Sequence, residues 1–331
     1  MTAPYRIFGV ELSPYSVKVR SYCRYKGIPH EWIERSQATM GEFQKHAKLP
    51  LVPLVITPEG ESWQDSTPIL EKFEPLFPEP SVHPDEPVAA FVSTLLEEFG
   101  DEWGNKWMFH YRWAREADQI SAAERIAKSM MPDLEGEALA QAAGGVRERM
   151  AGRTWFVGSS PETAPQIEGS FRQGMAQLEA HLAERPYLFG QRPAFGDFGL
   201  WAQIYEAWTD PTGGALLEES APHVVAWAKR MLEPKADGAF EPWAELAPSL
   251  EPFLREQVGA RFLPWSEANA AAIAAGEDRF SVELAGETYT QKPQKYHAKS
   301  LAVLRQKYAA AAGPPELEAL LERTGCLARL R

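Results

Sequence analysis

The segment Ser13-Pro14-Tyr15-Ser16 follows a short apolar stretch, residues 5–10, and opens an amphipathic run that ends at Gly27. Proline just inside a helix start and glycine just past its end are typical of helices. The pattern therefore predicts a strand, a tight junction and then a helix. At such a junction, free backbone N–H groups and the positive end of the helix dipole favour a thiolate or another anion.

Both polar positions of this junction are serines. In redox proteins the same place carries Cys-Pro-Tyr-Cys, where the helix dipole lowers the pKa of the first thiol. Because Ser13 and Ser16 stand at both positions, a protein dithiol couple cannot form here. The two cysteines of the chain, Cys23 and Cys326, also cannot make a disulfide framework or a cysteine-based zinc site. We therefore expect a reducing, cytoplasmic setting, and no metal, because the seven histidines form no close ligand pair.

Alternating strand and helix signals continue beyond this junction. The order β-α-β-α-β-β-α within about 75 residues predicts a small mixed sheet with helices packed against it. The later segments are a strand at 30–34, a helical run at 40–48, a strand at 51–56, a short strand at 61–64 and a helix at 68–73.

Two further features lie in this first part of the chain. Pro53 interrupts an apolar strand, where proline is normally excluded, so it needs a reason. A cis Val52–Pro53 bond would turn the Val52 backbone outward and leave it free to pair with an extended peptide ligand. Asp65 and Ser66 stand at a helix start, whose hydroxyl and free N–H groups could hold a carboxylate.

The rest of the chain is expected to be helical. Five prolines at 74–87 cannot continue a helix or a central strand, which indicates a linker. Residues 91–114 have apolar positions three and four apart, the mark of one buried helical stripe. Residues 279–290 alternate around a glycine and predict a hairpin. Other helices are expected near 121–131, 135–150, 163–183, 195–208, 221–232, 242–257, 265–275, 295–311 and 315–323.

These segments suggest four parts. We predict an α/β domain at 1–77, a proline-rich linker at 78–87, a larger all-α domain at 88–233, and a C-terminal extension at 234–331 that packs on the helical domain and contains the hairpin. The extension could be a plain packing cap, a lid over a site or a partner surface.

Charge and hydropathy narrow the possible partners. The 331 residues include 34 Lys and Arg against 46 Asp and Glu, a formal net charge of −12. An acidic chain argues against nucleic acid or an anionic membrane as the main partner, because phosphates require clustered Lys and Arg. No stretch approaches about 18 consecutive apolar residues, so no membrane span is expected.

Taken together, the ordered motifs resemble the glutathione transferase family, whose first domain has a thioredoxin-like fold. The matching strings are SPYSVKVRSYCRYKGIPHEWIE at 13–34, LPLVPLVITPEG at 49–60 and WQDSTPILEKF at 63–73. A fourth match, YLFGQRPAFGDF at 187–198, is similar to the helix-capping box of the second domain. There Ala194 replaces the expected hydroxyl residue, but Asp197 could still reach back to the Ala194 N–H.

The resemblance implies glutathione as co-substrate, with no metal and no nucleotide. It places Ser13, or Ser16 as a second candidate, at the catalytic position. Val52, beside cis-Pro53, would pair with the cysteinyl backbone of glutathione. The γ-glutamyl end would bind Asp65 and Ser66, and the glycyl carboxylate Lys48.

The second substrate would bind along the first helix after the linker. Trp103, Trp107 and Tyr111 share one face of it at i, i+4 and i+8, and we group them with Tyr15 as the expected pocket. The alternative is that these aromatics are the core of the helix bundle or of a dimer. The resemblance thus implies a cytoplasmic, homodimeric glutathione transferase that acts on a small apolar electrophile. A glutathione transferase-like binding or scaffolding protein without turnover is the rival hypothesis.

Overall fold

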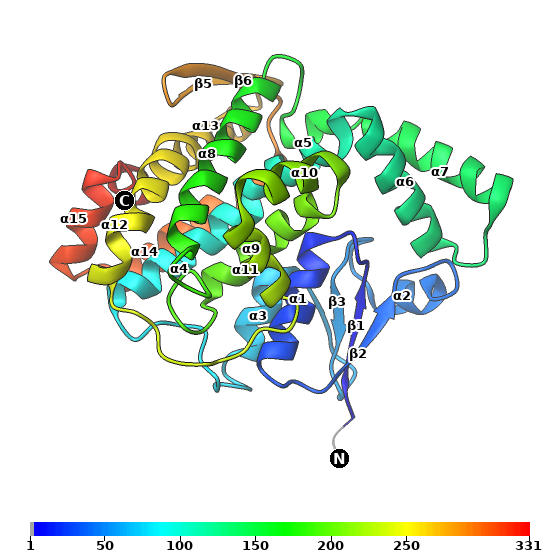
Figure 1. Ribbon diagram of the computed structural model, residues 1–331, viewed down its shortest axis with the longest axis horizontal. Coiled ribbons are helices and arrows are strands. Elements are labelled where there is room, and N and C mark those ends of the chain that lie inside the picture. The colour runs from blue at the N-terminus through cyan, green and yellow to red at the C-terminus, as the bar shows by residue number, and fades with distance from the viewer. Residues whose placement is uncertain (1–2) are drawn as a thin grey trace.

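The structure is a computed structural model that describes residues 3–331. Its first part is a four-stranded sheet of order β2-β1-β3-β4, in which β1 and β2 are parallel and the other pairs antiparallel (Figure 1). The predicted β-α-β-α-β-β-α order is confirmed. The elements are β1 (Tyr5–Gly9), α1 (Pro14–Tyr25), β2 (His30–Glu34), α2 (Met40–His46), β3 (Leu54–Ile56), β4 (Ser62–Gln64) and α3 (Ser66–Phe73).

Helices cover both faces of this sheet. Neighbouring residues of a strand point to opposite faces, and Ile7 joins the main core while Phe8 packs with Phe43 of α2 on the other side. Because both faces of β1 are covered by apolar groups, its register is fixed. The N-terminal end of α1, where the candidate catalytic serines lie, is therefore held by a rigid sheet.

The second part is helical, as predicted. The expected helix at 91–114 begins earlier, at Pro87, and contains one π-helical segment. Its Gly100 packs against the backbone of α9, because an added Cβ would lie 2.5 Å from the Leu200 nitrogen. The elements are α4 (Pro87–Phe99), η1 (Gly100–Gly104), α5 (Asn105–Ala114), α6 (Glu116–Met130), α7 (Gly136–Ala151), η2 (Thr154–Val157), α8 (Ala164–Leu182), α9 (Phe195–Trp208), α10 (Pro211–Ser220) and α11 (Pro222–Arg230).

Asp197 caps α9 in the way the sequence suggested. Its carboxylate accepts hydrogen bonds from the N–H of Ala194 at 2.9 Å and from the N–H of Leu188 at 2.9 Å. The Trp227 indole N–H donates to the same carboxylate at 2.9 Å. The missing hydroxyl at Ala194 is therefore offset by a fully buried carboxylate that also ties α11 to the helix start.

The C-terminal extension folds as further helices and the predicted hairpin. Figure 1 shows it on the side of the molecule away from the α6–α7 pair, with α12 beside α8 and α14 near α4. Buried apolar residues of all three parts form one continuous cluster. The elements are α12 (Trp243–Phe253), η3 (Leu254–Phe262), α13 (Leu263–Ala275), β5 (Phe280–Leu284), β6 (Glu287–Gln291), η4 (Lys295–Ala298), α14 (Ser300–Ala311), α15 (Pro315–Arg323) and α16 (Leu327–Leu330).

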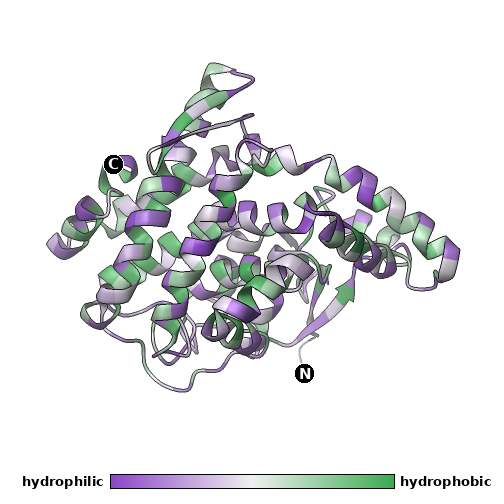
Figure 2. Ribbon diagram, turned by 45° about the horizontal axis from the view of Figure 1, so that its top comes forward, coloured by the Kyte–Doolittle hydropathy of each residue, from purple (hydrophilic) through white to green (hydrophobic). Residues whose placement is uncertain are grey.

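Along most helices hydrophobic and hydrophilic stretches alternate, as expected for helices with one buried face (Figure 2). Within residues 3–331, no helix is both long and apolar enough to cross a membrane.

Candidate glutathione site

A cavity of about 410 Å³ lies where the α/β domain meets the helical domain and the extension. All five residues expected to bind glutathione line it, and so does Tyr15. Residues of later segments complete its wall: Asn105 of α5, Phe156 of η2, and Tyr296 and His297 of η4. The predicted members of the lining are Tyr15, Lys48, Val52, Pro53, Asp65 and Ser66.

One wall of the cavity is a loop held by Gln64 on the edge strand β4. The Gln64 side-chain oxygen accepts hydrogen bonds from the N–H groups of Lys48 at 2.8 Å and Leu49 at 3.0 Å. Its amide nitrogen donates to the carbonyl oxygens of Leu49 and Leu51, both at 2.9 Å. The loop leads into the Val52–Pro53 bond, which is cis, as expected.

The opposite wall is the N-terminus of α3. Asp65 has a φ of +77°, a left-handed conformation that is uncommon for a non-glycine residue. Its carboxylate makes no capping hydrogen bond, and burial raises its pKa. A residue in such a strained conformation persists only where the surrounding structure holds it in place. Residues of this kind are found most often at active sites and ligand sites. The first residues of α3 thus line the cavity at a helix N-terminus, a place that favours negatively charged groups.

The Ser66 hydroxyl contacts a buried ionic cluster. Its oxygen lies 3.4 Å from Lys18 Nζ and 3.4 Å from Asp101 Oδ2. Lys18 Nζ also pairs with Glu97 Oε1 at 2.5 Å and with Asp101 Oδ2 at 2.7 Å. Burial lowers the pKa of Lys18, but the two carboxylates outweigh burial and raise it, so the ammonium stays charged. This cluster fastens α1 and α3 to the first helix of the helical domain.

The two candidate catalytic serines lie at the start of α1. Ser13 is the N-cap of α1, and its hydroxyl accepts a hydrogen bond from the Ser16 N–H at 3.3 Å. The Ser16 hydroxyl is buried without a hydrogen-bond partner among residues 3–331. Neither serine lines the cavity, whereas Tyr15 between them does, with its hydroxyl donating to the Asp101 carbonyl at 3.0 Å.

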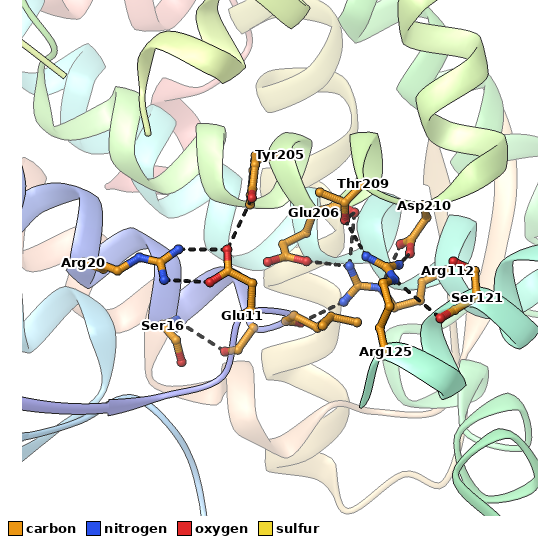
Figure 3. A network of polar contacts seen from close by, with 12 residues as sticks. Glu11, Ser16, Arg20, Arg112, Ser121, Arg125, Tyr205, Glu206, Thr209 and Asp210 are labelled. Carbon is orange, nitrogen blue, oxygen red and sulfur yellow. Dashed lines mark hydrogen bonds and ion pairs between the residues drawn. The ribbon is translucent and has the colours of Figure 1, made fainter. Parts of the chain in front are cut away.

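A buried arginine fixes the loop that leads to Ser13 (Figure 3). Arg112 of α5 donates from Nη1 to the Leu12 carbonyl at 2.8 Å. Its other nitrogens pair with Glu206 at 2.6 Å and Asp210 at 2.7 Å. Burial lowers the pKa of Arg112, but these carboxylates more than compensate and raise it. Arg112 therefore anchors the N-terminal end of α1 to α5 and α9.

Three of the four residues grouped as the expected second-substrate pocket lie away from this cavity. Trp103, Trp107 and Tyr111 do not line the cavity and are buried in the core, the alternative considered for them. Both indole N–H groups donate to the Ser170 hydroxyl of α8, each at 3.0 Å. The Tyr111 ring packs on Phe171 with centroids 4.6 Å apart. The shared face of the helix is thus covered by α8 and, at Trp103, by Trp265 and Tyr289 of the extension. Of the predicted pocket residues, Tyr15 alone lines the cavity.

Sequence reasoning missed the contribution of the extension and of η2. Tyr296 and His297 lie at the start of the helix expected near 295–311, where the structure has the 3₁₀ helix η4 followed by α14. The expectation of a helix did not indicate which part of the molecule these two residues would face. Phe156 lies in a four-residue 3₁₀ helix. Their aromatic character was the one available signal, and it could not indicate which surface they face.

A small mixed sheet with its helices, followed by a larger helical domain, is the architecture of the class of proteins to which the comparisons also point. Family models for the glutathione S-transferase N-terminal and C-terminal domains match residues 7–81 and 135–230. The chain belongs to the glutathione S-transferase family.

Several solved structures are similar in fold. A glutathione S-transferase from Methylobacterium radiotolerans, in complex with glutathione sulfonate, is 20% identical, with 72% of this chain and 99% of that chain covered and a TM-score of 0.41. The beta-etherase LigF from Sphingobium is 20% identical, with 70% and 95% covered and a TM-score of 0.48. A Tau class enzyme from mango is 16% identical, with 75% and 97% covered and a TM-score of 0.38. No curated protein matches the chain.

Proposed function

We propose that this chain is a glutathione transferase that binds glutathione in the 410 Å³ cavity. The observation that carries the proposal is that all five residues expected from the resemblance line this one cavity. In this proposal the Val52 backbone pairs with the cysteinyl unit, and the start of α3 at Asp65 and Ser66 holds the γ-glutamyl end. Lys48 neutralises the glycyl carboxylate.

The chemistry assigned to the site is activation of the glutathione thiol. The S–H proton leaves to solvent, and the thiolate is stabilised by the N-terminus of α1 and the Ser13 hydroxyl. The sulfur then forms a bond to an electrophilic carbon of an apolar substrate, and the leaving group departs with the electron pair of the broken bond. Tyr15, next to Pro14 in the first turn of α1, lines the cavity, and Ser16 is the second serine candidate.

A cytoplasmic location and a homodimer belong to the same proposal, as does the absence of a metal or nucleotide cofactor. Their support is the resemblance and the composition. The rival function is that of a non-catalytic glutathione transferase-like protein used for binding or scaffolding. The rival is favoured by one observation, namely that neither candidate serine lines the cavity.

Two measurements separate these functions. A ligand that binds the folded state at 100 times its dissociation constant stabilises it by about 2.7 kcal/mol. Glutathione should therefore raise the melting temperature, and an activated aryl chloride should then be consumed with formation of the thioether. Stabilisation without thioether formation would favour the non-catalytic binding protein. No stabilisation would contradict glutathione binding, and with it the proposed transferase.

A further inference from the structure

The C-terminal extension contributes one histidine to the wall of the candidate glutathione cavity. His297 of η4 lines the cavity and is 4% exposed. Among residues 3–331 it is the only histidine of that lining. In the proposed function the glutathione thiol must lose a proton, and an imidazole is the side chain best suited to accept one near neutral pH.

The imidazole of His297 is backed by a buried carboxylate. Its Nδ1 contacts Oε2 of Glu102 on η1, and no other side chain of residues 3–331 pairs with this carboxylate. A buried carboxylate is costly unless it is paired, so the two groups stabilise each other. The Trp265 ring of α13 packs edge-on against the imidazole, with centroids 5.3 Å apart. Because Nδ1 is occupied by Glu102, Nε2 is the nitrogen that can accept a proton.

The same segment η1 also holds the residue of α1 that lines the cavity. The Tyr15 hydroxyl donates to the Asp101 carbonyl at 3.0 Å, and Asp101 directly precedes Glu102. Consecutive residues of η1 therefore hold Tyr15 and His297. Tyr15 lies in the first turn of α1, the helix whose N-terminus stabilises the thiolate in the proposed function. The imidazole and this helix start thus meet the cavity over one short segment.

The other titratable groups of the cavity wall are poorly suited to take the thiol proton. They are Tyr15, Lys48, Asp65, Lys72 and Tyr296. Burial raises the pKa of both tyrosines, so they keep their own protons, and lysine ammonium groups are donors only. The carboxylate stands at the start of α3, which the proposed function assigns to the γ-glutamyl end. Burial lowers the pKa of His297, so its resting imidazole is neutral and can be protonated.

Resting on the proposed function, we infer that His297 is the general base that takes the proton from the thiol of bound glutathione, and that Glu102 positions it. The S–H bond breaks with its electron pair left on sulfur, and the proton forms an N–H bond at Nε2. The Glu102 carboxylate stabilises the resulting imidazolium. The proton passes to solvent once the thiolate has bonded to the electrophile, which returns the imidazole to its neutral form. The extension thereby supplies a catalytic residue.

A pH titration of bound glutathione, followed by the ultraviolet absorbance of the thiolate, tests the inference without turnover. The wild type can form the thiolate as an ion pair with the imidazolium, and His297→Gln cannot. The pKa of the bound thiol should therefore rise by about one unit or more in His297→Gln. Glu102→Gln should give a smaller rise. His223→Gln, at an exposed histidine outside the cavity lining, is the matched control and should titrate as the wild type does.

Turnover provides a second measurement. General base catalysis typically contributes 10²–10⁴ in rate, and because the helix N-terminus already acidifies the thiol, His297→Gln should lower kcat by about tenfold or more. The affinity for S-methylglutathione, which has no thiol proton, should not change. Glu102→Gln should lower kcat in the wild type but not further in His297→Gln, because residues that act as a unit are not additive. Added imidazole should restore part of the rate of His297→Ala.

Failure of the inference and failure of the proposed function give different results. A folded His297→Gln variant whose bound thiol titrates as in the wild type would overturn the inference and leave the glutathione site in place. If His297→Gln does not fold, the titration of Glu102→Gln decides, and an unshifted thiol there has the same consequence. Failure of the wild type to bind both glutathione and S-methylglutathione would overturn the proposed function and the inference with it.

Discussion

Gln64 is one side chain that holds a whole wall of the candidate glutathione site. Its amide forms four hydrogen bonds with the backbone of residues 48–51, two as acceptor and two as donor. Without Gln64, the same backbone groups would form hydrogen bonds with water. Each hydrogen bond to Gln64 therefore contributes only about 0.5–1.5 kcal/mol to the net stability. The importance of Gln64 thus lies in fixing the position of the loop more than in overall stability.

We expect Gln64→Ala to weaken glutathione binding about tenfold and to change the melting temperature little. The loop would lose its preorganisation, and binding would have to order it. Calorimetric titration of glutathione into the wild type and the variant measures this. Lys72→Ala, at another cavity-lining position, serves as the control. Unchanged affinity in Gln64→Ala would show that the loop does not contact the ligand.

Ser13→Ala should lower kcat with a generic electrophile and leave glutathione affinity nearly unchanged. Loss of one preorganised donor to an anion costs up to about 10²–10³ in rate in the strongest cases, and a partly hydrated site should lose less. The pH–rate profile should move to higher pH, because the bound thiol loses a group that lowers its pKa. Ser16→Ala is the internal comparison, since the Ser16 hydroxyl is buried. Loss of rate in Ser16→Ala alone would reverse the assignment.

The contacts of the Ser66 side chain illustrate a property that local sequence patterns cannot predict. Local patterns placed Ser66 at a helix start, and the structure agrees. The direction of its hydroxyl depends on Lys18, 48 residues earlier, and on Asp101, 35 residues later. No local pattern contains that information. The backbone N–H of Ser66, and not its hydroxyl, is consequently the better candidate for holding a carboxylate.

At the scale of elements, α1 is joined to α4 and η1 through one fully buried lysine. Lys18 Nζ contacts Glu97, Asp101 and, at 2.9 Å, the Thr67 hydroxyl. Removal of one member of a buried ion cluster leaves the opposite charges unpaired, which costs more than the cluster itself contributes. The relative position of the two domains therefore depends on this contact.

Lys18→Met should lower the free energy of unfolding by about 3–5 kcal/mol, because two buried carboxylates lose their cation. Urea denaturation measures this change. Lys72→Met, which replaces an exposed lysine on α3, should change the stability by no more than about 0.5 kcal/mol. The combination of Lys18→Met with Glu97→Gln and Asp101→Asn should recover part of the loss. Equal stability of the two single variants would show that the cluster is not essential to domain packing.

The buried imidazole of His181, on α8, should make the stability of the folded chain depend on pH. Its Nε2 lies 2.9 Å from the Leu188 carbonyl and its Nδ1 2.8 Å from the Ser249 hydroxyl, and burial lowers its pKa to about 4. As the pH falls below about 6.5, the His181 imidazole is protonated in the unfolded chain, whereas in the folded chain it stays neutral until about pH 4. Stability should therefore decrease between these values, by about 3 kcal/mol in total.

His181→Gln should remove this contribution, so that stability depends less on pH between about 6.5 and 4. Chemical denaturation at several pH values measures the slope. His223→Gln, which replaces an exposed histidine, should leave the slope of stability against pH as in the wild type. A slope that is identical in the wild type and His181→Gln would mean that other groups cause the acid sensitivity.

Most elements could be predicted because their signals are local. The β-α-β-α-β-β-α order, the long helix after the linker and the hairpin all follow from periodicity, prolines and glycines. The helix α10 was missed because its sequence, PTGGALLEES, contains two glycines that lower helix propensity. The π-helical segments were also missed, because their bulges depend on close contacts such as that between Gly100 and α9.

At the scale of the whole molecule, the candidate site is shared by three parts of the chain. The glutathione-binding half could be predicted, because its residues are near one another in the sequence of one small domain. The other half could not, because it depends on packing between distant segments. Phe156 reaches the cavity through the packing of η2 on α5, and Tyr296 and His297 reach it through the packing of the extension on α4 and α8. One continuous core joins these parts, so the cavity and the extension should be gained or lost together.

The most direct test of this account is amide hydrogen exchange with and without saturating glutathione. Binding in the cavity should slow exchange at the Val52 and Ser66 amides and in the first turn of α1, with little change in α6 and α7, which form no part of the cavity lining. Protection confined to other segments, or no protection anywhere at millimolar glutathione, would contradict the claim that this cavity is the glutathione site.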